Sequence, residues 1–184
     1  MMKKKLSLIF LFFMCFTILK AQNYFTKNGN VSFFSKTSME DIQADNNQVV
    51  SVLNAQTGDL QFSVIIKNFH FKKALMEEHF NENYLESDKF PKSTFKGTIS
   101  NINSINFAKD GNYPVNVIGN LTLHGITQKV TTPASIQIVQ GKITGIAVFK
   151  LLLADYKISI PKVVENNISK TIEITVNCLY NQKN

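Results

Sequence analysis

The sequence is poor in the residues that usually build disulfides, metal sites and catalytic centres. Among 184 residues there are two cysteines, three histidines and no tryptophan. Cys15 lies in an N-terminal apolar run, so Cys178 would remain alone in a mature chain, where it cannot form an intramolecular disulfide. His70, His79 and His124 are scattered and match no ligand spacing. We therefore expect no catalytic residues, no metal and no cofactor, and a domain stabilised by its hydrophobic core.

Long hydrophobic runs are also absent, except for one near the N-terminus. There "MMKKK" precedes "LSLIFLFFMCFTIL", and "KAQ" supplies a small residue after it. The apolar run is short for a membrane span, and this layout predicts a secretory signal peptide over residues 1–21, cleaved after Ala21. An uncleaved anchor is the alternative, with slight support from Lys20. We expect a periplasmic or secreted protein whose mature domain covers residues 22–184.

Positive charge is low once the signal is set aside. The formal charge of +7 includes four lysines of residues 1–21, and without them 16 basic residues face 13 acidic ones, leaving +3. Nucleic-acid binding needs a concentrated basic face, so no nucleic-acid partner is expected. About 160 residues are enough for one domain with a sizeable core.

Several short runs alternate apolar and polar residues with a period of two. Strict alternation predicts strands with one buried face. Turn signals such as "KDGN" and "QGK" separate them at meander spacing, which indicates antiparallel pairing. The runs are "DLQFSVIIK" at 59–67, "STFKGTISNI" at 93–102, "VNVIGNLTL" at 115–123 and "TIEITVNC" at 171–178.

One stretch has helical spacing instead. Phe71 and Leu75 are followed a turn later by His79 or Phe80, with charged residues on the other side. We therefore predict a short amphipathic helix over residues 71–80. The pair "FP" at 90–91 then returns the chain to an extended form, because the residue before a proline avoids the helical region.

Many one-sided strands with a single helix leave two architectures, a sandwich or a closed barrel. Closure removes exposed sheet edges. A barrel of about eight strands is either filled by side chains or holds one slender ligand. Gly97 and Gly119 fall on faces whose other members are large, which favours some empty volume inside.

Two segments of the sequence resemble those of a known family. "GNLTLHGITQKVTTP" (residues 119–133) is similar to the signature hairpin of the YceI-like proteins, and "YLESDKFPKSTFKG" (residues 84–97) resembles their second marker. "LADYKISIP" and "TIEITVNC" also occur in family order. The resemblance covers about residues 24–180. Residues 28–58 depart from it, because they lack the histidine-serine pair of many members, and this suggests a divergent branch.

The resemblance implies a mainly β fold, a single antiparallel eight-stranded lipocalin-like barrel with one short helix packed at its side. It also implies a long apolar cavity for a polyisoprenoid or other long-chain amphiphile, and export to the bacterial periplasm. On this view the segment 119–133 is a hairpin in the wall of a lipid cavity. The imidazole of His124 would cap a backbone group at its turn.

Candidate ligand-binding residues follow from the apolar faces, and we expect about half of them to be plain core. One group should line the cavity wall: Phe62, Val64, Phe95, Leu121, Leu123 and Phe149. A second group should belong to the helix that closes one end: Phe71, Leu75, Met76 and Phe80. Met76 suits that role because an unbranched thioether adapts to varied tails.

Two further features leave alternatives open. Lys72, Lys73, Lys89 and Lys92 either rim the cavity and meet a phosphate head group or form a solvated face with the acids around them. Cys178 is either a reactive thiol or a small buried hydrophobe, and its place in the apolar register favours burial.

Two functions therefore compete. The first is non-catalytic binding and carriage of a long-chain amphiphile in the cell envelope, with transient membrane contact. The second is a structural or protein-interaction barrel with a filled interior and no lipid ligand. The sequence does not specify an oligomeric state.

Overall fold

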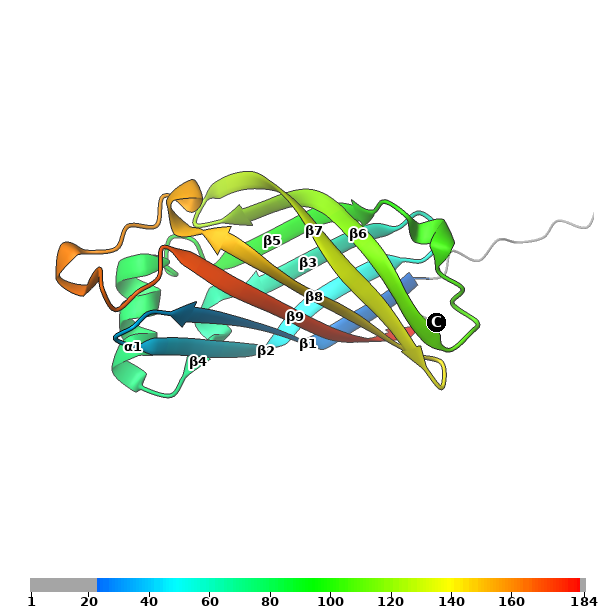
Figure 1. The fold of residues 1–184 in the computed structure, drawn as a ribbon, viewed down its shortest axis with the longest axis horizontal. Coiled ribbons are helices and arrows are strands. Elements are labelled where there is room, and N and C mark those ends of the chain that lie inside the picture. Colours follow the sequence, from blue (N-terminus) through cyan, green and yellow to red (C-terminus); the bar gives the residue numbers. More distant parts are fainter. Residues whose placement is uncertain (1–22, 183–184) are drawn as a thin grey trace, which may run out of the picture.

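The structure is a computed structural model that describes residues 23–182 (Figure 1). Alternating runs form long strands that wrap around a common axis. The strands are β1 (Asn23–Lys36), β2 (Asp41–Asn54), β3 (Asp59–Ile65), β4 (His70–Phe71), β5 (Lys92–Ile99), β6 (Gly111–Leu123), β7 (Ile126–Val139), β8 (Lys142–Leu152) and β9 (Thr171–Gln182).

The sheet closes into a barrel. Its order is β1-β9-β8-β7-β6-β5-β3-β2, and β2 pairs back with β1, while the two-residue β4 is added beside β2. All neighbouring strands are antiparallel. Closure leaves the eight long strands without a free edge. The predicted single eight-stranded antiparallel barrel is confirmed.

The predicted hairpin is formed by β6 and β7. Its strands pair from Gly111↔Ile138 to Leu123↔Ile126, and His124 and Gly125 make the two-residue turn. Both turn residues have positive φ, 50° and 73°, as this tight connection between twisted strands requires. The glycine also lies against the ring of Phe90, which leaves no room for a side chain.

The helix differs from its predicted bounds. α1 spans Ala74–His79 and continues as a π-helical turn over Phe80–Tyr84, so residues 71–73 are not helical. Phe71 instead belongs to β4 and pairs with Ala44 of β2. The hydrogen bonds that extend the sheet to residues 70–71 keep this stretch extended, a tertiary contact that helical spacing does not report.

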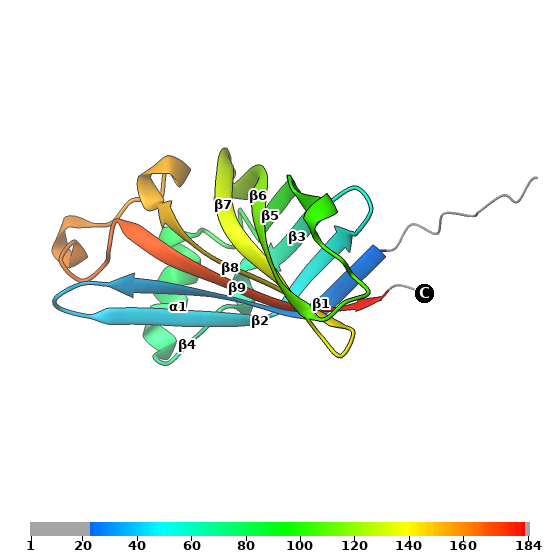
Figure 2. The ribbon, with the colours of Figure 1, turned by 45° about the vertical axis from the view of Figure 1, so that its right-hand side comes forward.

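The two ends of the barrel are packed differently. At the end near the β7–β8 turn, a dense core contains Leu53, Ile138 and Ile143, all at most 2% exposed. The opposite end carries α1, the β1–β2 turn and the segment between β8 and β9 (Figures 1 and 2). That segment includes the 3₁₀ turns Leu153–Tyr156 and Lys162–Val164.

The predicted signal peptide, residues 1–21, lies outside the described residues. None of the helices in the described part of the chain is long and apolar enough to span a membrane.

Candidate functional site

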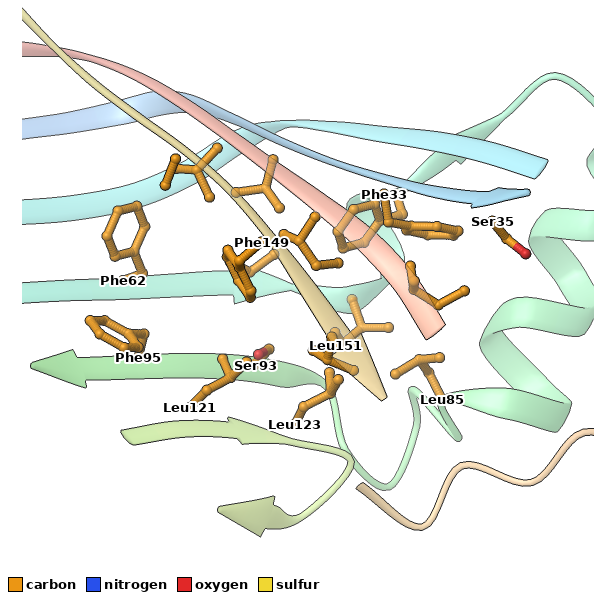
Figure 3. A pocket seen from close by; sticks show the side chains of 18 of the residues that line it. Phe33, Ser35, Phe62, Leu85, Ser93, Phe95, Leu121, Leu123, Phe149 and Leu151 are labelled. Atoms are coloured by element: carbon orange, nitrogen blue, oxygen red, sulfur yellow. The ribbon is translucent and has the colours of Figure 1, made fainter. Parts of the chain in front are cut away.

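The interior of the barrel contains an apolar cavity with a volume of about 560 Å³. All eight barrel strands contribute to its wall, together with α1 and the turn that follows it. All ten candidate residues named from the sequence line this cavity, from Phe62, Val64 and Phe95 to Met76 and Phe80. Figure 3 shows Phe62, Phe95, Leu121, Leu123 and Phe149 around one continuous space.

The cavity wall is apolar but incompletely packed. Phe62, Phe95, Leu121 and Phe149 point inward, yet each remains partly accessible. The core residues at the dense end are almost fully buried, with Leu53 at 0% and Ile138 at 1%. Inward-facing side chains that stay accessible border unfilled volume. The barrel interior is therefore not filled by its own side chains.

Phe95 sits over two glycines in adjacent strands. Gly97 of β5 pairs with Gly119 of β6, and a Cβ on Gly119 would lie 2.5 Å from Cζ of Phe95. The space above the glycines is thus taken by the Phe95 ring. The interior does contain the expected empty volume, but the glycines do not create it. They make room for the ring of Phe95, and Phe95 lines the cavity.

Sequence reasoning missed four aromatic residues of the wall: Phe33, Phe69, Tyr84 and Tyr180. Phe33 packs against Phe69, Phe71 and Phe80 with ring centroids 5.4–5.6 Å apart. Phe80 is also 5.1 Å from Phe71, so this cluster fastens the turn after α1 to the barrel. The signal for Phe33 was its alternation with Val31 and Ser35, which also line the cavity.

The cavity reaches solvent at the α1 end. Leu75 lines the cavity and is 61% exposed. Glu40, Lys73 and Asn167 line the same region and are joined: Lys73 Nζ lies 2.9 Å from Glu40 Oε1, and Asn167 Nδ2 donates to Glu40 Oε2 at 3.5 Å. These four residues are referred to below as the mouth. Hydrogen bonds from Lys73 and then Asn167 lower the pKa of Glu40, so the carboxylate stays ionised beside the lysine.

Of the two alternatives for the four lysines, a rim of the cavity or a solvated face, the structure favours the solvated face for three of them. Of the four candidates only Lys73 lines the cavity. Lys89 lies near Glu86 and 4.9 Å from the centre of the Phe90 ring. Lys72 and Lys92 are exposed and are not part of the cavity wall.

His124 has the capping role that the sequence suggested. Its Nδ1 donates to the carbonyl oxygen of Tyr156 at 3.0 Å. Its Nε2 lies 2.7 Å from Glu86 Oε2, a partner the sequence did not reveal. The hydrogen bond from His124 and the nearby Lys89 lower the pKa of Glu86. His124 therefore ties the β6–β7 turn to the segments after α1 and after β8, at the α1 end of the barrel.

The histidines do not converge on a metal. Within residues 23–182, no group of three His, Cys, Asp or Glu side chains is placed to hold a metal ion. His70 lies 3.6 Å from Glu77, in a surface contact beside α1.

Cys178 lies in the dense core, at 0% exposure, on the same face of β9 as Ile172, Ile174 and Val176. Burial raises the pKa of its thiol to about 12.

The burial of Cys178 should slow its chemical labelling. In a Cys15→Ser variant, Cys178 is the remaining thiol. A thiol reagent at pH 8 should label the native protein at least ~100-fold more slowly than the urea-unfolded protein, because the thiolate is the reactive form. Fast native labelling would instead indicate a strand shifted by one residue.

Solved structures with the same fold include three bacterial proteins. A polyisoprenoid binding domain from Saccharophagus degradans, implicated in plant cell wall breakdown, matches with a TM-score of 0.76 at 15% identity, over 89% of this chain and 99% of that one. BcnA of Burkholderia cenocepacia matches with 0.69 at 17% identity, over 83% and 96%. A YCEI protein of Campylobacter jejuni matches with 0.52 at 15% identity, over 74% and 81%.

A search of curated proteins finds no match. The family comparison is decisive, because a model described as a YceI-like domain matches residues 16–179, which is most of the sequence. The chain with this barrel and cavity belongs to the YceI-like family.

Proposed function

We propose that this protein binds and carries a long-chain amphiphile, a polyisoprenoid or another lipid, without catalysing a reaction. The observation that supports this most directly is the unfilled apolar cavity of about 560 Å³ inside the barrel. Ligand pockets in proteins typically have volumes of about 300–1,000 Å³. The Saccharophagus neighbour, a polyisoprenoid binding domain, agrees with such a ligand.

The distribution of charge suggests how the ligand lies. Among the described residues that line the cavity, the lysine and the glutamate are both at the mouth, and the deeper wall carries no Lys, Asp or Glu. We place the aliphatic tail in the deep part, against Phe62, Phe95 and Leu121, and the head group at the mouth. Phe71, Leu75, Met76 and Phe80 would contact the part of the tail nearest the head.

An uncharged polar head group suits this mouth better than a phosphate. Lys73 is already paired with Glu40, so an anionic head would meet a carboxylate beside the only lysine among the lining residues of the described chain. The amide of Asn167, which is partly accessible in the cavity wall, can bond to an uncharged head.

The alternative function, a structural or interaction barrel, assumed a filled interior. The accessible side chains around the cavity count against that assumption. We further propose a periplasmic or secreted location in the cell envelope. That proposal rests on the signal-like sequence of residues 1–21. A carrier that holds the lipid tail inside its barrel would allow the lipid to cross an aqueous compartment.

Affinity should depend on the length of the bound tail. Burying one methylene gains about 0.8 kcal/mol, so each two-carbon extension of a linear alcohol should tighten binding roughly tenfold. The gain should stop when the tail fills the cavity. Displacement of a fluorescent probe by alcohols of increasing chain length would measure this series.

A plateau in affinity at long chain lengths is the diagnostic result, because affinity for a nonspecific surface site would continue to rise with chain length. Mass spectrometry of lipids extracted from protein purified from its native host would identify the natural ligand. If no long-chain amphiphile binds, in either experiment, the carrier function is wrong and only the fold assignment remains.

A further inference from the structure

The most exposed apolar side chains of the protein gather at one end. Among the described large apolar residues, the three with the greatest exposed fractions are Val163 at 91%, Met39 at 70% and Leu75 at 61%. Single exposed apolar residues are common on protein surfaces and carry little information. Here, however, all three belong to segments at the α1 end of the barrel.

These three residues come from segments far apart in the sequence. Met39 is in the β1–β2 turn, Leu75 is in α1, and Val163 is in the 3₁₀ turn Lys162–Val164. Figures 1 and 2 both show these segments at the same end of the barrel. Glu40 connects all three segments, because it contacts Lys73 just before α1 and Asn167 just after the 3₁₀ turn.

The same end contains the mouth of the cavity. Each of the three residues is in the mouth or next to a residue that lines the cavity: Leu75 lines it, Met39 precedes Glu40, and Val163 precedes Val164. An apolar surface placed around the opening of a lipid cavity is suited to contact the medium from which a lipid enters. We call Met39, Leu75 and Val163 the apolar tip.

We propose that the apolar tip inserts into the surface of a lipid bilayer, so that the mouth faces the membrane during loading and release of the ligand. This rests on the proposed function. The three side chains would enter the boundary between head groups and acyl chains, as the apolar faces of peripheral membrane proteins do. The tip thereby gives the proposed transient membrane contact a defined location.

The charges around the tip favour apolar rather than electrostatic attachment. Residues 36–41, 72–78 and 161–170 together carry five lysines and five acidic residues. Attraction to anionic lipids needs an excess of basic residues near the membrane. Binding to uncharged phosphatidylcholine should therefore occur, and it should change little with salt.

A second copy of the chain is a poorer occupant for this surface. Stable protein interfaces bury roughly 800 Å² on each partner with a well-packed centre. Three side chains on separate turns provide a small apolar area with polar residues between them. Insertion into a fluid bilayer does not require a complementary partner surface.

The test uses phosphatidylcholine vesicles and the full chain, with a double variant Met39→Asp/Val163→Asp. Neither residue lines the cavity, so affinity for an alcohol presented in solution should be unchanged. Vesicle binding, measured by co-sedimentation, should fall at least about tenfold, because two charges would have to enter the interface. The wild-type protein should bind with less than a twofold change between 0.1 and 0.5 M salt.

Val139→Asp is the matched control. Val139 is 52% exposed beside the β7–β8 turn, at the opposite end of the barrel, and its replacement should leave vesicle binding unchanged. Equal losses in the control and the double variant would overturn the proposal. So would absence of wild-type vesicle binding, or a dimer in analytical ultracentrifugation that the double variant dissociates.

These outcomes are separable from the carrier function. Vesicle binding that depends on the tip, without any amphiphile in the cavity, would support docking and refute carriage. Amphiphile binding by a protein that does not bind vesicles would support carriage and refute docking.

Discussion

Replacing Leu121 with tryptophan should abolish most long-chain binding while leaving the barrel folded. Leu121 lies in β6 opposite Phe95 of β5, and its side chain faces the cavity (Figure 3). A larger side chain there would block the deep part of the cavity. Excluding three to four methylenes costs about 2.7 kcal/mol, so affinity for an 18-carbon alcohol should fall about 100-fold. Probe displacement measures the affinity.

Asn120→Trp is the control for this variant. Asn120 is the preceding residue of β6, and it is exposed on the outer face of the barrel. Its replacement should leave binding unchanged. Circular dichroism and thermal melting should show that both variants are folded, because overpacking can also destabilise a core. A folded Leu121→Trp protein with wild-type affinity would show that the tail does not pass Leu121.

Replacing Gly97 with alanine adds only one methyl group, but it should strongly lower the free energy of unfolding. A Cβ at this position would lie 2.6 Å from Cζ of Phe95 and 2.7 Å from Cα of Gly119, and it would also meet the carbonyl oxygen of Ile118. Two of these atoms belong to the backbone of β6, so a rotamer change cannot relieve the contact. We expect a loss of about 3 kcal/mol. The melting temperature should fall by roughly 6–12 °C.

Gly111→Ala provides the comparison. The nearest atom to a Cβ on Gly111 is a ring atom of Tyr113, 3.3 Å away, in an exposed region at the start of β6. Its effect should stay within about 0.5 kcal/mol. A Phe95→Ala change in the Gly97→Ala background should restore little stability, because the backbone contacts remain. Full recovery in that double variant would show that the ring alone excludes a Cβ.

Alternation in the sequence correctly identified the inward faces of β3, β5, β6 and β9. Side chains alternate between the two faces of a strand, so a run such as "DLQFSVIIK" reveals its buried set without knowledge of its partners. The burial of Cys178 followed from the same argument. The tight turn at His124 and Gly125 was equally local, because positive φ at a two-residue turn favours glycine.

The first two strands were not recognised in this way. β1 shifts register between Thr26 and Gly29 and again between Gly29 and Val31. Each shift disturbs the alternation, and polar residues of β2 obscure the rest. The fold of this region followed from resemblance to a family. Val31, Phe33 and Ser35 do alternate after the second shift, so the signal for Phe33 was present but was missed.

The sequence alone determined which side chains face inward, but the tertiary structure decided what they enclose. Inward apolar residues produce either a solid core or a cavity, and the difference depends on how far apart the closed strands hold them. Phe95 over Gly97 and Gly119 shows that a gap in the pattern can be filled by a neighbour. The pairing of Lys73 with Glu40, and of His124 with Glu86, likewise joins residues 33 and 38 positions apart. Such contacts depend on where strands and turns meet in space, whereas alternation depends only on the local geometry of one strand.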